Sequence, residues 1–106
     1  MAIVSLCNAV KPSSTAEVTL YTAGSGSAVP ITKFVAHNAT DTASTYTVRI
    51  YGATGTPDSI QPVTVLNRYK SVTPAALAGA VIPPNGRLAV TVGVANTISF
   101  TVAGDV

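Results

Sequence analysis

Residues 30–51 read PITKFVAHNATDTASTYTVRIY, and they have the clearest strand pattern of the chain. In its second half the apolar residues Tyr46, Val48 and Ile50 alternate with polar ones. Side chains of a strand point alternately to its two faces, so a period of two predicts a strand with one buried face. The other face, which carries Arg49, is predicted to be exposed.

The first half of the stretch predicts a second strand, central in its sheet. Phe34 and Ala36 share the buried face, whereas the opposite face mixes apolar and polar residues from Ile31 to His37. Such a mixture indicates a strand that is covered on both faces for part of its length. Residues 38–42, NATDT, have side chains that hydrogen-bond their own backbone and favour turns. The simplest prediction is that the two strands form a β-hairpin.

Short strands continue outward in both directions from this centre. Alternation over 16–22, 87–92 and 97–102 predicts further strands, the last two as a second hairpin, and strands are also assigned around Val63 and Val65 and over residues 74–82. Pro84-Asn85-Gly86 predicts a tight turn. Up to eight short strands without an amphipathic helix predict an all-β fold. We expect a single antiparallel two-sheet β-sandwich of the jelly-roll type, with an immunoglobulin-like sandwich as the alternative.

A predicted loop separates the N-terminal segment from this domain. An apolar run over residues 3–7 is followed at once by Lys11-Pro12-Ser13-Ser14, which has loop chemistry. We therefore assign residues 1–15 to an N-terminal strand or arm and residues 16–106 to the β-sandwich domain.

Composition limits the classes of partner. The 106 residues form one domain, of which 9% are charged, with a net charge of +2. The few cations are scattered, which argues against nucleic acid as a partner. No apolar run approaches the length of a membrane span or a signal peptide, so we expect synthesis in the cytoplasm and no membrane partner. A surface with so few charged residues is well suited to being buried against neighbouring subunits, so we expect a homo-oligomer.

The residues that catalysis requires are scarce. One cysteine and one histidine make Cys7 and His37 the only thiol–imidazole pair, and Asp41 and Asp58 are the candidate carboxylate pair in predicted loops. A structural role is favoured for both pairs. His37 with Asp41 lacks a third metal ligand, and the glycine-rich turns lack the lysine and the helix of a phosphate loop. We expect no enzyme activity, no catalytic residues, no metal and no cofactor.

Three tyrosines, Tyr21, Tyr51 and Tyr69, are predicted to point outward. An exposed tyrosine can stack on a sugar or a base, but its amphipathic ring more often fills a partly wet subunit interface. The interface interpretation is favoured.

Several short segments resemble small virion proteins of tailed bacteriophages. They are the run Leu20-Tyr21-Thr22 before a Gly/Ser turn, the strand from Ile31 to Thr40, the strand Tyr46-Thr47-Val48-Arg49-Ile50, the turn from Ile82 to Val90, and the closing strand from Thr97 to Gly104. The resemblance covers about residues 20–104. It implies a β-sandwich that decorates a capsid or sits at a tail or fibre, commonly as a trimer, and it brings no catalytic or ligand residues with it.

The expected function is therefore that of a non-enzymatic viral structural protein. The leading hypothesis is a capsid decoration or cement protein that binds the major capsid protein or another virion protein as an oligomer, with a trimer favoured and the capsid surface favoured over the tail. The alternative is a carbohydrate- or host-binding module of a phage tail or fibre, with Tyr21, Tyr51 or Tyr69 and the 52–58 loop on one accessible face. The candidate contact residues are Ile3, Val4, Leu6, Tyr21, Lys33, His37, Arg49, Tyr51 and Tyr69.

Overall fold

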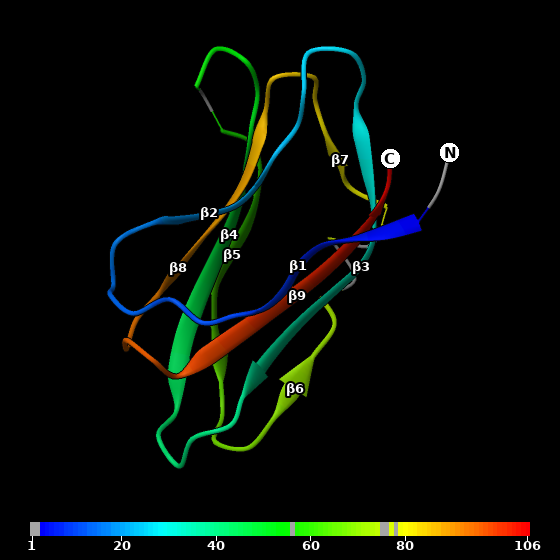
Figure 1. The fold of residues 1–106 in the computed structure, drawn as a ribbon. Helices are drawn as coiled ribbons and strands as arrows, with labels where there is room; N and C mark the ends of the chain where they lie inside the picture. The colour runs from blue at the N-terminus through cyan, green and yellow to red at the C-terminus, as the bar shows by residue number, and fades with distance from the viewer. Residues whose placement is uncertain (1–2, 56, 75–76, 78) are drawn as a thin grey trace.

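The computed structural model describes residues 3–55, 57–74, 77 and 79–106, with only the backbone at 58–61. Within these residues the chain forms nine strands and no helix (Figure 1). The strands are β1 (Ile3–Val10), β2 (Val18–Thr22), β3 (Val29–Asn38), β4 (Ser44–Tyr51), β5 (Pro57–Leu66), β6 (Ser71–Val72), β7 (Val81–Ile82), β8 (Arg87–Val92) and β9 (Ile98–Asp105). The predicted all-β class is confirmed.

The strands form two antiparallel sheets that pack face to face. The first sheet has the order β1-β9-β3-β6, with the short β7 also paired to β3, and the second has the order β2-β8-β4-β5. The pairs β1–β9, β2–β8, β3 with β6 and β7, and β4–β5 are nested, as in a long antiparallel ribbon rolled into two layers. This is the jelly-roll arrangement. An immunoglobulin-like sandwich orders its strands as A-B-E-D and C-F-G, so that alternative is wrong.

Both predicted hairpins are wrong, although their strands exist. β3 lies in the first sheet and β4 in the second, and β8 and β9 are divided in the same way (Figure 1). Each connection is an arch that crosses from one sheet to the other over the edge of the core. Alternation shows which face of a strand is buried, and that requirement is met equally by a partner beside the strand or across the core.

Asn38 fixes the arch between β3 and β4. Its side chain is fully buried, and its amide nitrogen donates to the carbonyl oxygens of Thr42 at 2.8 Å and Leu66 at 3.2 Å. Its side-chain oxygen accepts from the backbone N–H of Thr40 at 3.0 Å and from the Thr40 hydroxyl at 2.7 Å. The turn chemistry of residues 38–42 was therefore read correctly, but it serves a crossing between sheets.

A bulge explains the mixed pattern of β3. The register with β9 shifts between Ile31 and Lys33, so Ile31 and Phe34 both face the core, at 1% and 2% exposure. Cover on both faces was thus a wrong explanation of the pattern. The central position is confirmed, because β9 and β6 flank β3.

The core lies between the sheets and is built around aromatic rings. Phe34 and Phe100 have ring centroids 5.9 Å apart, and Tyr46 and Phe100 6.1 Å apart, so three strands meet at one aromatic cluster. Burial raises the pKa of the Tyr46 hydroxyl, which hydrogen-bonds the side chain of Thr64. The five predicted inward residues of the opening stretch, Phe34, Ala36, Tyr46, Val48 and Ile50, are all buried.

Two other predicted segments differ in extent. Of residues 74–82, only Val81–Ile82 is a strand, while Leu77 and Ala80 donate backbone hydrogen bonds to the carbonyls of Pro74 and Leu77; residues 75, 76 and 78 lie outside the described part. Gly79 there has a φ of +86°, which an extended strand does not accommodate. The strand around Val63 and Val65 begins earlier than predicted, at Pro57 within the predicted 52–58 loop.

Candidate interaction surfaces

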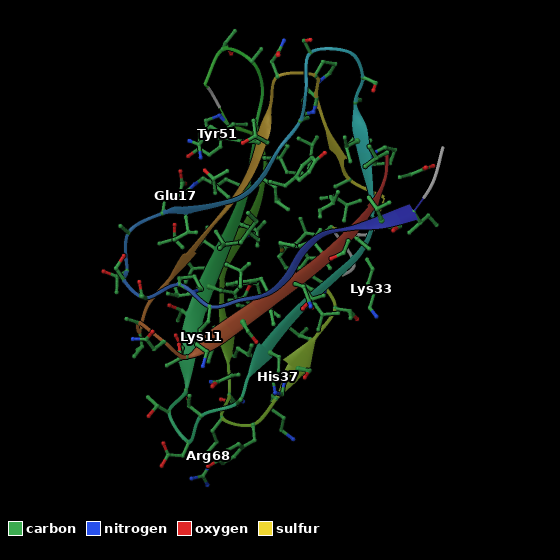
Figure 2. All side chains as sticks on the ribbon, viewed as in Figure 1. Lys11, Glu17, Lys33, His37, Tyr51 and Arg68 are labelled. Atoms are coloured by element: carbon green, nitrogen blue, oxygen red, sulfur yellow. The ribbon has the colours of Figure 1, made fainter. Side chains whose placement is uncertain are left out.

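The outer face of the second sheet carries a cluster centred on Glu17. This carboxylate accepts the hydroxyl of Tyr51 at 2.8 Å, and it pairs with Arg49 at 3.4 Å and with Arg87 at 3.2 Å. Arg87 also donates to Thr19 Oγ1 at 3.1 Å and lies over the Tyr51 ring, 3.9 Å from its centroid. Figure 2 shows Glu17 and Tyr51 beside each other there. These contacts tie the segment before β2 to β4 and β8, so we call the group the Glu17 cluster.

The Glu17 carboxylate has a lowered pKa. Burial alone would raise it, but hydrogen bonds from Tyr51, Arg87 and Arg49 and the charge of Arg87 together outweigh that effect. Glu17 is therefore ionised at neutral pH and holds both guanidinium groups in place. Because one carboxylate faces two arginines, the cluster keeps a formal charge of +1 and still offers unused guanidinium donors.

Sequence reasoning found Arg49 and Tyr51 but missed the other members of this cluster. Arg49 and Tyr51 do point outward, as predicted, and both are partly buried by their contacts. Glu17 and Arg87 were not proposed as contact residues. Glu17 stands 70 residues from Arg87, and no local pattern reveals that the β2–β8 pairing brings them together.

Tyr21 does not share that outward face. The β2–β8 register shifts between Thr19 and Tyr21, and this bulge turns the ring toward the interior, where it packs partly buried against the core. The alternation that placed Tyr21 beside Glu17 assumed a regular strand. Its predicted outward direction is therefore wrong.

The outer face of the first sheet carries Lys33 and His37 among small residues. Lys33 pairs in register with Ala103, and His37 with Ser99 and Ser71 (Figure 2). His37 Nδ1 shares a hydrogen bond with the Ser71 hydroxyl, which fastens the short β6 to β3. Among the described contacts of His37, no carboxylate orients the ring, so the pair lacks the third member of a catalytic triad.

The two candidate pairs of reactive residues lie on parts of the backbone that the fold keeps apart. Cys7 lies on β1 opposite Val102, and His37 lies on β3 opposite Ser99, so β9 separates them. Burial raises the pKa of the Cys7 thiol, against a smaller lowering by a backbone hydrogen bond to Val102, which is opposite to the activation of a nucleophile. Asp41 precedes β4, while the backbone of Asp58 adjoins its far end.

Metal-ligating side chains do not cluster in the described residues. No group of three or more His, Cys, Asp and Glu side chains there is placed to hold a metal ion. That part of the chain also contains no helix with the length and apolar character needed to cross a membrane.

Apolar side chains are exposed at two edges. On β1, Ile3 and Val4 are exposed, whereas Leu6 is half-buried and packs against the core. The second group, which we call the valine patch, consists of Val63, Val65 and Val94, exposed by 70%, 63% and 41%. A strand around Val63 and Val65 was predicted, but neither valine is among the predicted contact residues.

The valine patch adjoins a shallow depression of about 240 Å³. Its lining comes from the β3–β4 and β8–β9 connections, the start of β4 and the edge strand β5, namely Ala43, Ser44, Thr45, Val65, Gly93 and Val94. The lining is mostly apolar and small, which suits contact with another protein surface.

The tyrosines do not share one face with the 52–58 loop. Tyr51, which ends β4 just before that loop, lies at the upper end in Figure 2, and Figure 1 shows the β2–β3 and β7–β8 connections at the same end. Tyr69 lies at the opposite end, where its backbone N–H donates to Thr40 at 3.2 Å. The length of β4, about 23 Å for seven residue steps, separates the two tyrosines. Of these two tyrosines, Tyr51 therefore lies at the end of the fold that carries the 52–58 loop, and Tyr69 does not.

Comparison with known proteins adds one result, which concerns the fold. The sequence matches no protein-family model and no curated protein. Among solved structures, a chain of the T13 particle of infectious bursal disease virus is similar, with a TM-score of 0.62 and 14% identity over 97% of this chain and 30% of that one. The VP2 subviral particle and D431N mutant VP2 T=1 particles of the same virus align with TM-scores of 0.44 and 0.46, at 17% and 15% identity, over 97% of this chain and 30% and 29% of theirs. This chain thus spans less than a third of the viral chains, and the first likeness shows that it shares their jelly-roll fold.

Proposed function

We propose that this protein is a non-enzymatic structural component of a virus particle, namely a decoration or cement protein that binds the assembled shell as an oligomer. The observation that carries the proposal is the jelly roll itself, which aligns along 97% of the chain with a chain of a viral particle at a TM-score of 0.62. The sequence resemblance to small phage virion proteins points in the same direction.

The surface supports an assembled state. Only 9% of the residues are charged, and among the described residues the ion pairs all converge on Glu17. The valine patch and the exposed end of β1 place apolar side chains at two separate edges. A protein that uses one edge between its own copies and the other on the shell accounts for both, and a trimer is the oligomer we propose.

The mechanism would be thermodynamic. A protein that binds the assembled lattice and not its free subunits stabilises the lattice by its binding free energy. An oligomer repeats the same contact at each protomer, which raises the overall affinity through effective concentration. No residue needs to react for this function.

Reconstitution tests the proposal directly. Shells assembled without this protein are mixed with it, and binding and the temperature of shell disruption are measured, while light scattering after size exclusion gives the oligomeric state. We expect an oligomer that binds shells and raises the disruption temperature. Replacing Val63 and Val65 by serine should weaken binding or oligomerisation by about tenfold or more. Val81→Ser, which changes an exposed valine on β7, serves as the matched control. A monomer that ignores shells would refute the proposal.

The position on the particle is part of the proposal. We favour the capsid surface over the tail, and gold labelling of intact particles with an antibody to this protein distinguishes the two. Label spread over the shell is expected; label confined to one vertex would place the protein at the tail.

A carbohydrate- or host-binding module of a tail or fibre remains the second candidate. One observation favours it: Tyr69 stays highly exposed at the free lower end of the molecule. Tyr21 and Tyr51 no longer support it, because their rings are held by the core and by Arg87.

A further inference from the structure

The lower end of the molecule carries an exposed aromatic ring between two cations. The β5–β6 connection, residues 67–70, reads Asn-Arg-Tyr-Lys, and all four residues are exposed. It lies against the β3–β4 arch, residues 39–43, through the hydrogen bond from Tyr69 N to Thr40 O. Figure 2 shows Arg68 at the extreme lower end of the fold. We call residues 39–43 and 67–70 together the cationic tip.

The backbone at Tyr69 is strained and held firmly. Its φ of +56° lies in the left-handed region, which is unfavourable for a bulky side chain. The Tyr69 N–H donates to Thr40, and the carbonyl of the next residue, Lys70, accepts from Asn38 N at 2.8 Å. Tyr69 as a whole residue is 64% exposed, so packing against the core does not compensate for this strain. Strain of this kind is concentrated at sites that bind or react.

The two cations of the tip also form no ion pair among the described residues. Both ion pairs of the described residues are made by Arg49 and Arg87, so neither Arg68 nor Lys70 has a carboxylate partner there. Asp41 is the single carboxylate of the tip, and its side chain accepts from the Thr42 hydroxyl at 3.4 Å. Two cations against one carboxylate leave a moderate excess of positive charge.

We infer that the cationic tip binds a carboxylate-bearing sugar of a surface polysaccharide. The Tyr69 face offers a platform for the C–H face of a sugar ring, and Arg68 or Lys70 pairs with the sugar carboxylate. The surrounding side chains of Asn67 and Thr42 are polar and suit sugar hydroxyls. On this inference, the strained backbone at Tyr69 serves to hold its ring outward for contact with a ligand.

Other classes of anionic partner fit the tip less well. A tyrosine that anchors a protein interface is normally ringed by apolar contacts, whereas the exposed neighbours here are polar or small. Single-stranded nucleic acid is bound by several aromatic rings along a basic groove, whereas this tip has one ring and one opposing carboxylate. The inference rests on the carbohydrate-binding alternative and does not depend on shell binding.

Calorimetric titration with matched sugars tests the inference. The probes are a galacturonate oligosaccharide, a sialic-acid oligosaccharide, an uncharged galactose oligosaccharide of the same length, and a short single-stranded DNA. We expect one of the acidic sugars to bind at least tenfold more tightly than the uncharged one and than the DNA. The better of the two acidic probes identifies the source of the carboxylate.

Three variants locate the site. Tyr69→Asn places in the left-handed region a residue that tolerates it, so we expect a higher midpoint of thermal unfolding together with binding weakened by about tenfold or more. Arg68→Gln with Lys70→Gln should weaken the acidic sugar and leave any binding of the uncharged one unchanged. Lys33→Gln removes an exposed cation on the first sheet and should change nothing, which makes it the matched control.

The outcomes separate the two claims. Failure of all the sugars to bind overturns the inference and the carbohydrate-binding alternative together. Binding that survives Tyr69→Asn and the double glutamine variant overturns the inference alone, because the sugar then uses another surface. DNA bound more tightly than either acidic sugar also overturns it.

Discussion

The side-chain amide of Asn38 donates a hydrogen bond to the carbonyl oxygen of Leu66 at 3.2 Å, and this bond joins the end of β3 in one sheet to the end of β5 in the other. The same amide nitrogen also holds Thr42, and its oxygen holds Thr40. A single buried side chain therefore satisfies the backbone of an arch that leaves one sheet and enters the other.

Asn38→Ala should destabilise the fold strongly. The change leaves two carbonyl groups and one N–H without their partner in a buried place, and we expect a loss of about 3 kcal/mol in the free energy of unfolding. Urea denaturation measures it. The exposed Asn67 beside Leu66 provides the control, and Asn67→Ala should stay within about 0.5 kcal/mol of the wild type. Equal stability of the two variants would show that the arch does not depend on Asn38.

Glu17→Gln should lower stability in a pH-dependent manner. The pKa of Glu17 is lowered in the folded protein below its ordinary value of 4.5, so its contribution is fully present above pH 4.5 and is lost as the pH falls through the folded pKa. At pH 7 we expect the variant to be less stable by about 1 kcal/mol, since the contacts are partly exposed.

The gap between the Glu17→Gln variant and the wild type should close at low pH. A protonated glutamic acid resembles glutamine in charge, so thermal unfolding of both proteins from pH 7 down to pH 3 should converge. Added salt at pH 7 should narrow the gap as well. A difference that is constant with pH would mean that Glu17 acts through packing and not through its charge.

Gly86→Ala should disrupt the turn between β7 and β8. An added Cβ would lie 2.3 Å from the carbonyl oxygen of Tyr51 and 2.9 Å from that of Pro83, and neither backbone atom can move freely. We expect a loss of about 2 kcal/mol from this overpacking, measured by thermal unfolding. At Gly24 nothing lies within 4 Å of the added atom, so Gly24→Ala should be neutral. A neutral Gly86→Ala would contradict the close approach of β4 to this turn.

A disulfide across β1 and β9 tests whether the first strand stays in its own chain. Ser5 and Ala103 pair in register at the edge of the first sheet, at a separation suited to a disulfide. In a Cys7→Ser background, Ser5→Cys with Ala103→Cys should cross-link within one chain and run as a monomer on a non-reducing gel. Ser5→Cys with Thr101→Cys, two residues out of register, should cross-link poorly. Covalent dimers or trimers would instead reveal β1 as an arm exchanged between neighbours.

Local sequence was sufficient for the faces of the strands. Phe34, Tyr46 and Val48 point into the core because apolar side chains at alternate positions of a strand lie on one face and are removed from water when that face is buried. The turn predicted at Pro84-Asn85-Gly86 is also confirmed: Gly86 N donates to Pro83 O at 2.8 Å, and Asn85 has a φ of +62°. Each of these features depends on residues within a few positions of one another.

Local alternation predicted the wrong face for residues next to β-bulges. The bulges at Ile31/Lys33 and Thr19/Tyr21 each shift the alternation by one residue, which brought Ile31 inward and turned Tyr21 toward the core. A bulge depends on the register with a partner strand, so the alternation within one strand does not predict it.

Local sequence was enough to predict an all-β chain whose strands each bury one face, because the period of two and the turn residues are local properties. Which strands share a sheet follows from the tertiary fold alone. The apolar side chains of β3 and β4 are buried equally well whether the two strands pair as a hairpin or face each other across the core. The same long-range pairing assembles Glu17 with Arg87 and brings Tyr69 against Thr40. Backbone hydrogen bonds join neighbouring strands, and every residue except proline can donate and accept them, so the alternation within one strand does not reveal which strand pairs with it.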